Sequence, residues 1–281
     1  MKYLFWGTPD FAAIILEKLI KAGFMPETVV CNPDRPVGRK KIITPPPTKS
    51  LIMKHKSWNI QILQPETFDP SFKIQVSRLQ PDLFIVAAYS QIIPKEILEI
   101  PRLGTIGVHP SLLPKYRGSS PIQTAILNGD EETGVSLYSV DEKMDHGPVL
   151  AKRELKIKNA LPTGRQAECR ILQQKLADLG ADLLIETLPK FLNNAIKPVV
   201  QDEDKATYTK KFITENGRVD LKDDPLLIER KIRALNPEPG VFTFIDGKRV
   251  KLLEAKISDD KVIITKTQTE GKKPVENSIV L

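Results

Sequence analysis

The sequence predicts an α/β protein of the Rossmann-like class, with a mostly parallel sheet and helices on both faces, followed by a small OB-like β-barrel domain. Strand-like apolar runs alternate with helix-like periodicity over the first two thirds of the chain, which is typical of βαβ units. The run Leu83–Ala88 is apolar throughout, as expected for a parallel strand buried on both faces. Short alternating runs around Asp246-Gly247 then indicate hairpins near the C-terminus.

The first βαβ unit begins at the N-terminus. Residues 2–7 are the first predicted strand, and Thr8 or Asp10 is expected to cap the helix that follows. A second strand is expected at 28–31. The turn between strand and helix lacks the Gly-x-Gly-x-x-Gly spacing, so a dinucleotide site is not predicted.

Residues 32–49 are predicted to be a loop without regular structure, because five prolines fix φ and remove backbone donors there. The surrounding sequence is basic: between residues 31 and 60, seven Lys and Arg residues accompany one Asp, a local excess of six positive charges. Such a stripe is typical of a protein with a phosphate-bearing partner, and a solvated loop is the alternative explanation.

Helices and strands continue to alternate as far as the C-terminal region, where short strands follow one another. Helices are expected at 48–56, 70–79, 94–98, 122–127, 166–188 and 226–235. Further strands are expected at 60–63, 83–88, 134–140, 148–155, 241–245, 250–255, 262–265 and in the run that ends at His109. We therefore expect an α/β domain over residues 1–189, a linker over 190–207 and a β-rich domain over 208–281.

Composition narrows the class of protein further. No apolar run approaches the length of a membrane span, and the apolar start of the chain is too short for a signal peptide. Cys31 and Cys169 lie far apart and follow no metal-type spacing, which indicates a reducing compartment. The expectation is a cytoplasmic monomer without a membrane partner.

One histidine and one carboxylate are candidates for catalysis. His109 ends a predicted strand, and open α/β sheets bind ligands at the carboxyl ends of their strands. A histidine with a pKa of about 6.5 exchanges protons near neutral pH, and a neighbouring carboxylate fixes its tautomer. Asp145, in the loop Met144–Pro148, is the candidate partner, with Asp141 and Glu142 as alternatives. A structural histidine and a turn-forming aspartate fit the same pattern.

Metal and serine chemistry are not favoured. His55, His109 and His146 are spaced irregularly, and no cysteine pair accompanies them. The serines after His109 lack the nucleophile elbow of serine hydrolases. The residues alone therefore predict an α/β enzyme with His/Asp acid–base chemistry, a basic loop and no metal.

Two motifs resemble those of a known family. The segments His109-Pro-Ser-Leu-Leu-Pro-Lys-Tyr-Arg-Gly118 and Met144-Asp-His-Gly-Pro148 resemble the signature of formyltransferases that use 10-formyltetrahydrofolate. Other segments, among them Gly7-Thr-Pro-Asp-Phe-Ala12 and Ile232-Arg-Ala-Leu-Asn-Pro237, are similar to the methionyl-tRNA formyltransferases of that family. The likeness runs from residue 3 to about residue 273.

The resemblance implies that the chain transfers the formyl group of 10-formyltetrahydrofolate to the free α-amine of initiator methionyl-tRNA. It places the catalytic histidine and aspartate at His109 and Asp145. The residues expected to line the folate pocket are Tyr89, Ser90, Gln91, Ile92, Ser111, Leu112, Leu113 and Pro114. The residues expected to contact the tRNA, through salt-sensitive phosphate contacts, are Arg35, Arg39, Lys40 and Lys41.

The chain departs from the family pattern at one catalytic position. The family carries an asparagine two residues before the histidine, and this chain has Gly107, which has no side chain to donate to an oxyanion. Removing one such donor typically lowers the rate by about two to three orders of magnitude. The alternatives are a slow enzyme, a replacement donor such as a water or Ser90, and a formyl-folate or tRNA-binding protein without catalysis. A formyltransferase for sugar nucleotides or other small amines is a further alternative.

Further departures lie outside the motifs, and one of them is Glu238, where the family usually has an aromatic residue. Residues Leu161–Arg170 form an insert relative to the family pattern. The chain ends soon after Pro274, so the last element of the family is expected to be missing.

Overall fold

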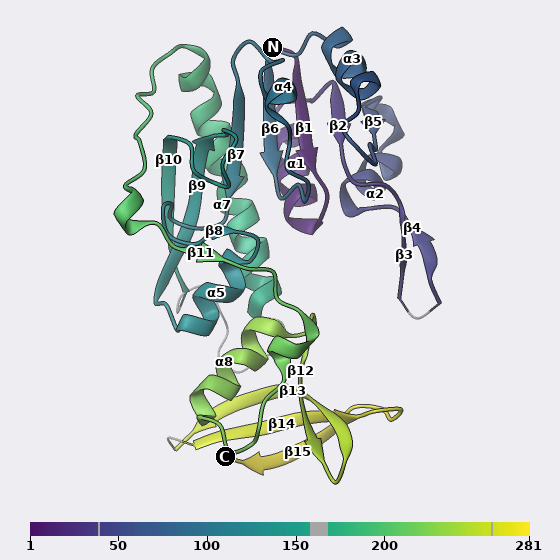
Figure 1. Ribbon diagram of the computed structural model, residues 1–281, viewed down its shortest axis with the longest axis vertical. Helices are drawn as coiled ribbons and strands as arrows, with labels where there is room; N and C mark the ends of the chain where they lie inside the picture. The colour runs from purple at the N-terminus through teal and green to yellow at the C-terminus, as the bar shows by residue number, and fades with distance from the viewer. Residues whose placement is uncertain (39, 158–167, 260) are drawn as a thin grey trace. The chain divides into compact units, whose positions relative to one another are not determined.

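The computed structural model describes residues 1–38, 40–157, 168–259 and 261–281, which form two compact units (Figure 1). Unit 1 contains the described residues of Met1–Arg117, Gly134–Glu154 and Leu176–Thr207. Unit 2 contains those of Gly118–Thr133, Leu155–Lys175 and Tyr208–Leu281. Each unit is therefore assembled from three separate stretches of the chain.

Unit 1 is built on a seven-stranded sheet. Its strands are β1 (Tyr3–Gly7), β2 (Thr28–Val30), β5 (Gln61–Leu63), β6 (Leu83–Ala87), β7 (Thr105–His109), β9 (Glu132–Ser139) and β10 (Val149–Lys156). They lie in the order β10-β9-β7-β6-β1-β2-β5; the strands from β7 to β5 run parallel, and β9 pairs antiparallel with β7. The predicted mostly parallel sheet is confirmed. Because β6 and β7 run parallel, their carboxyl ends lie at the same edge of the sheet, where open α/β sheets bind ligands.

Helices cover both faces of this sheet, as predicted. On one face lie α1 (Asp10–Lys21) and α7 (Glu168–Leu192), and Lys18 of α1 pairs with Asp182 of α7 at 2.8 Å. On the other face lie α3 (Pro70–Arg78) and α4 (Lys95–Leu98), which pack on a core that includes Trp6 and Phe84. Successive strand residues alternate between these two faces. Unit 1 also contains α2 (Pro47–Lys54), η1 (Lys56–Trp58) and η2 (Glu203–Lys205).

The basic segment contains a β-hairpin, so the prediction of an irregular loop was wrong. Strands β3 (Arg35–Val37) and β4 (Ile42–Thr44) pair antiparallel, with Pro36 opposite Ile43. A two-stranded ribbon has two open edges, and it therefore tolerates a proline that an interior strand would exclude. In Figure 1 the hairpin extends away from the sheet of unit 1. Arg39 lies outside the described residues.

Two helix boundaries also differ from the predictions. Pro9 is the N-cap of α1 and Asp10 its first residue, so neither Thr8 nor Asp10 caps the helix. The Thr8 hydroxyl instead accepts a hydrogen bond from the Asn32 backbone N–H at 3.1 Å. Helix α7 continues through Pro189 to Leu192 and thus ends later than predicted. Most of the predicted Leu161–Arg170 insert lies outside the described residues, and its last three residues begin α7.

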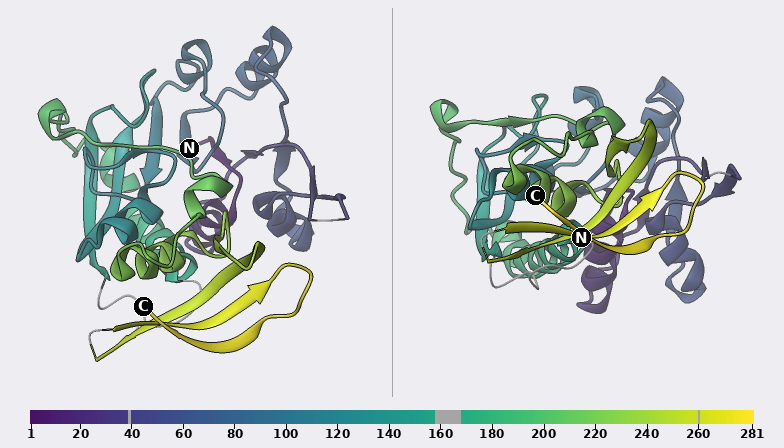
Figure 2. Two further views of the ribbon diagram at one scale, coloured as in Figure 1. Left: turned by 60° about the horizontal axis from the view of Figure 1, so that its bottom comes forward. Right: turned by 90° about the horizontal axis from the view of Figure 1, so that it is seen from below.

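Unit 2 contains a second, antiparallel sheet. Its strands β12 (Val241–Ile245), β13 (Lys248–Ser258), β14 (Lys261–Thr269) and β15 (Val275–Val280) lie side by side in chain order (Figure 2). The predicted β-rich C-terminal domain is confirmed, and β15 is a strand beyond those predicted from the sequence. The unit also contains α5 (Pro121–Asn128), α8 (Pro225–Leu235), η3 (Thr214–Gly217), β11 (Tyr208–Thr209) and Gly118 of the short strand β8 (Arg117–Gly118).

Candidate active site

The structure brings the predicted histidine and aspartate together at the carboxyl edge of the sheet in unit 1. His109 is the last residue of β7 and is buried, and its Nδ1 lies 3.5 Å from Oδ2 of Asp145. This distance is longer than a typical N–H···O hydrogen bond. On the other side of the ring, Nε2 lies 2.9 Å from the Tyr116 carbonyl oxygen. Both ring nitrogens therefore face oxygen atoms, one of a carboxylate and one of a carbonyl group.

The two alternative carboxylates have other partners. Asp141 lies 2.6 Å from His146 Nδ1, and Glu142 pairs with Lys95 at 2.7 Å. The loop that carries these residues folds back tightly on itself. Its backbone comes so close to Ser139 that a Cβ on Gly147 would collide with the Ser139 carbonyl oxygen. Glycine is the residue that permits such a close backbone approach. Asp145 is thus the carboxylate that the fold places beside His109.

Position 107 is covered by a tyrosine for which no role was predicted from the sequence. Gly107 on β7 pairs in register with Tyr138 on β9, and a Cβ on Gly107 would lie 2.5 Å from Cζ of that tyrosine. The Tyr138 hydroxyl donates a hydrogen bond of 2.7 Å to Oδ1 of Asp145. Burial, with the charge of Asp145 adding to it, raises the pKa of Tyr138 well above its usual value, so the phenol keeps its proton. A glycine within an apolar strand was the signal for this contact.

A buried arginine holds the backbone of the Asp145 loop. Arg117 is fully buried, and its Nε and one terminal nitrogen donate to Oε1 of Gln201 at 3.1 and 2.9 Å. Gln201 in turn donates to the carbonyl oxygens of Asp145 and Gly147, both at 2.8 Å. The guanidinium also binds both oxygens of Glu203, at 2.6 and 3.0 Å, and these hydrogen bonds lower the pKa of that carboxyl group. Arg117 belongs to the family-like segment His109–Gly118, but no role was predicted from the sequence for Arg117 or Gln201.

The predicted folate residues after β7 form a tightly held loop. The Ser111 hydroxyl donates to the Lys115 carbonyl oxygen at 2.5 Å. Leu113 is fully buried and packs with Tyr138 and Val149. Leu112 is half-buried, and Leu113 and Pro114 line a cavity of about 450 Å³ in unit 1. The loop thus places its members next to His109, with the Ser111 and Leu113 side chains packed inside the protein.

The predicted folate residues after β6 lie along the neighbouring strand end. Tyr89 packs edge-on against Trp6, with ring centroids 5.4 Å apart. The Ser90 hydroxyl accepts a hydrogen bond from Asn32 Nδ2 at 2.7 Å, so the interaction found for this residue is with Asn32 and not with His109. Ile92 is 77% exposed, and Gln91 donates to a backbone carbonyl at 3.4 Å.

The predicted tRNA contacts that the structure describes are exposed at the hairpin. Lys40 and Lys41 are exposed in its turn. Arg35 forms an ion pair with Glu66, and Lys49 at the base of the segment pairs with Asp34 at 2.9 Å. The positive charge of the described hairpin is therefore partly compensated near its base.

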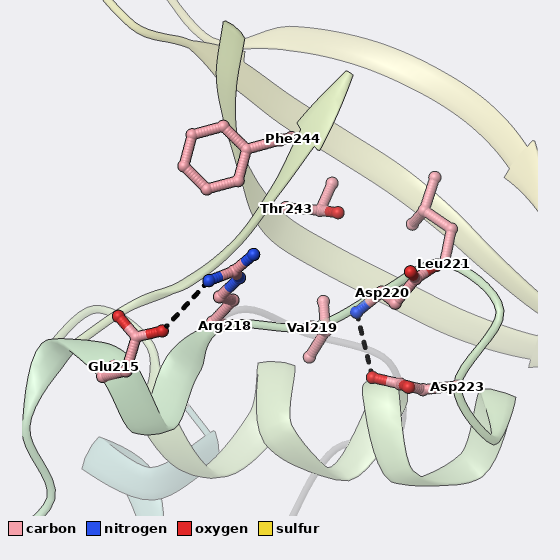
Figure 3. Close-up of a pocket in the computed structure, with 8 residues that line it drawn as sticks. All are labelled: Glu215, Arg218, Val219, Asp220, Leu221, Asp223, Thr243 and Phe244. Carbon is pink, nitrogen blue, oxygen red and sulfur yellow. Dashed lines mark hydrogen bonds and ion pairs between the residues drawn. The ribbon is translucent and has the colours of Figure 1, made fainter. Parts of the chain in front are cut away.

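A further cavity, of about 490 Å³, lies in unit 2 (Figure 3). It is lined by Glu215, Arg218, Val219, Asp220, Leu221, Asp223, Thr243 and Phe244. Arg218 pairs with Glu215 at 3.5 Å and lies over the Phe244 ring, 5.6 Å from its centroid. The three carboxylates outnumber the one guanidinium, which disfavours a phosphate ligand in this cavity.

Two kinds of feature were not found in the described part of the chain. No group of three or more His, Cys, Asp or Glu side chains there has an arrangement that could hold a metal ion. None of its helices combines the length and apolar content needed to cross a bilayer.

Fold and site together define an α/β protein with a buried histidine–aspartate pair at the ligand edge of its sheet. Residues 1–188 match the family model for formyl transferases, and residues 211–263 match the model for the formyl transferase C-terminal domain. The chain therefore belongs to the formyl transferase family. Its relatives include the methionyl-tRNA formyltransferase of Enterococcus faecalis, which is 42% identical over 89% of this chain and 78% of the relative. That of Chloroflexus aurantiacus is also 42% identical, over 92% of this chain and 81% of the relative.

Solved structures show the same fold at lower identity. Methionyl-tRNA formyltransferase from Clostridium thermocellum has a TM-score of 0.61 and 20% identity, over 99% of this chain and 100% of that one. The N-formyltransferase from Helicobacter canadensis, in complex with folinic acid and dTDP-3-aminofucose, has a TM-score of 0.66 and 20% identity over the same shares. HypX from Aquifex aeolicus, in complex with tetrahydrofolic acid, has a TM-score of 0.64 and 20% identity over 99% of this chain and 46% of that one.

Proposed function

We propose that this chain transfers the formyl group of 10-formyltetrahydrofolate to the α-amine of initiator methionyl-tRNA, in the cytoplasm. The observation that carries the proposal is the buried His109–Asp145 pair in a formyl transferase with methionyl-tRNA formyltransferases as relatives. In this proposal residues 1–189 are the catalytic domain, 190–207 the linker and 208–281 the tRNA-binding domain.

The chemistry assigned to His109 is proton transfer. The folate co-substrate supplies an activated formyl group; the attacking amine loses a proton as its new C–N bond forms, and N10 of the folate gains one as its C–N bond breaks. A histidine beside a carboxylate is suited to carry a proton between these nitrogens, because the carboxylate stabilises the charged ring. His109 Nε2 is hydrogen-bonded to the Tyr116 carbonyl, so a substrate amine reaches this nitrogen only in place of that bond.

The groups available for the developing oxyanion differ from the family pattern. Gly107 has no side chain, and the tyrosine that covers it gives its hydroxyl proton to Asp145. A hydroxyl has one proton to donate, so Tyr138 in this arrangement does not serve as the missing oxyanion donor. We therefore assign oxyanion stabilisation to His109 without a side-chain partner at position 107, and we expect a slower enzyme than one with an asparagine there.

The substrate assignment is tested by a formylation assay on purified protein with 10-formyltetrahydrofolate. Charged initiator tRNA, charged elongator methionyl-tRNA and an amino-sugar nucleotide are compared as acceptors. Formyl-methionine on the initiator tRNA is the expected product. Formylation of the amino sugar alone would favour the small-amine alternative, whereas folate binding without any formylation would favour a binding protein.

The exposed hairpin is predicted to contact the tRNA. Lys40→Ala with Lys41→Ala should raise KM for tRNA several-fold and weaken its salt dependence, because about two phosphate contacts are lost. KM for the folate should stay unchanged. The matched control is Lys73→Ala with Arg78→Ala, which removes two exposed positive charges from α3. This role would be contradicted if the two double variants raised KM for tRNA equally. It would also be contradicted if Lys40→Ala with Lys41→Ala raised KM for the folate as much as KM for tRNA.

A further inference from the structure

Tyr138 lies where a side chain at position 107 would have to go. The two residues are register partners on β7 and β9, and a Cβ on Gly107 would lie 2.5 Å from Cζ and 2.9 Å from the hydroxyl oxygen of Tyr138. Real Cβ atoms do not approach ring atoms so closely, since packed carbon atoms lie about 3.5–4.0 Å apart. The tyrosine ring and any residue larger than glycine at position 107 therefore exclude each other.

The position of the tyrosine ring is set by its neighbours. Leu113 of the loop after β7 and Val149 at the start of β10 form a buried cluster with Tyr138, and Val140 packs against that cluster. This packing leaves the ring little freedom, because protein cores are close-packed. It directs the hydroxyl to Oδ1 of Asp145 at 2.7 Å, while Oδ2 of the same carboxylate faces His109 Nδ1.

We propose that Tyr138 is a positioning residue: its ring occupies the space that Gly107 leaves, and its hydroxyl holds the Asp145 carboxylate against His109. The catalytic part of this inference rests on the proposed function. A family asparagine would donate towards the substrate, whereas this tyrosine donates towards the aspartate. Gly107 and Tyr138 thus form a coupled pair, and changing position 107 alone does not recreate the family site.

The first test removes only the hydroxyl, with Tyr138→Phe. A hydrogen bond to a charged group typically contributes enough to change a rate about tenfold to a hundredfold, so kcat should fall within that range. KM for both substrates should stay unchanged, since Tyr138 is not assigned a substrate contact. An unchanged kcat would overturn the proposal.

The control for this test is Tyr3→Phe. Tyr3 is also buried, and its hydroxyl donates to the Phe24 carbonyl oxygen at 2.7 Å, in β1 and away from His109. The Tyr3→Phe variant should have a lower thermal midpoint than the parent protein and the same kcat. If Tyr138→Phe behaved like Tyr3→Phe, with stability lost and kcat retained, the tyrosine would be purely structural.

The second test measures the coupling between positions 107 and 138 through thermal stability, so it does not depend on enzyme activity. Gly107→Asn alone should lower the thermal midpoint, because the new side chain displaces the Tyr138 ring. Gly107→Asn with Tyr138→Val should be more stable than Gly107→Asn, since valine suits a strand and frees the volume that asparagine needs. If the two substitutions lowered the thermal midpoint independently, so that their effects simply added in the double variant, the proposed pairing of Gly107 and Tyr138 would be wrong.

The two tests also separate this inference from the proposed function. If the parent protein has no formylation activity on any acceptor, the proposed function fails. The double-mutant cycle at positions 107 and 138, measured by thermal unfolding, still tests the pairing of the two residues. If the parent is active and the cycle is additive, the inference fails and the function stands.

Discussion

His109→Ala is expected to lower kcat for formylation by about two to four orders of magnitude, the usual contribution of a positioned general acid–base group. The histidine is the member of the site that can both accept and return a proton, and Asp145 lies 3.5 Å from its ring. Measurement of kcat and of KM for both substrates would check this prediction. Thermal unfolding would check that the variant folds.

A second histidine offers a control for this experiment. His55 is exposed and stacks on Trp58 with ring centroids 4.2 Å apart, outside the site. His55→Ala should keep the parent rate. A His109→Ala variant with parent-like kcat would contradict the assignment of the catalytic histidine, whatever the acceptor.

Arg117→Met is expected to lower the free energy of unfolding by about 3 kcal/mol, because hydrogen bonds to charged groups contribute about 1.5–3 kcal/mol and Gln201 loses its partner. Methionine keeps the volume of the aliphatic stem, so the change reports mainly on the hydrogen bonds. The variant should also lower kcat, since Gln201 holds the carbonyl oxygens of Asp145 and Gly147. Urea unfolding and initial rates measure the two effects.

The chain contains a matched pair for this comparison. Arg153 binds both oxygens of Glu186 at 3.1 and 2.6 Å, but its side chain is 34% exposed where that of Arg117 is fully buried. Exposed ion pairs contribute about 0–1 kcal/mol, so Arg153→Met should change stability little and leave kcat unchanged. Equal losses for the two variants would show that burial of Arg117 is not what makes its interactions important.

Local patterns predicted most elements of unit 1, because each depends on residues near it in the chain. The strand Leu83–Ala87 follows from a continuous apolar run, and the helix that begins at Glu168 follows from apolar periodicity. The proline content of residues 35–44 predicts an irregular segment, but a two-stranded ribbon tolerates Pro36, so the hairpin does not follow from composition. The last strand, β15, carries little apolar patterning, since most of its residues are exposed.

For the site, the sequence by itself identified the candidate histidine and the candidate aspartate, and it showed that position 107 has no side chain. Only the tertiary structure decided which residue occupies the space beside Gly107. Tyr138 reaches Gly107 through the antiparallel register of β7 and β9, and Arg117 reaches Gln201 across 84 residues of chain. Such contacts depend on which strands and loops become neighbours in space, and local periodicity carries no information about that. At Gly107, the feature that looked like a missing donor is, in the folded protein, one half of a packed pair.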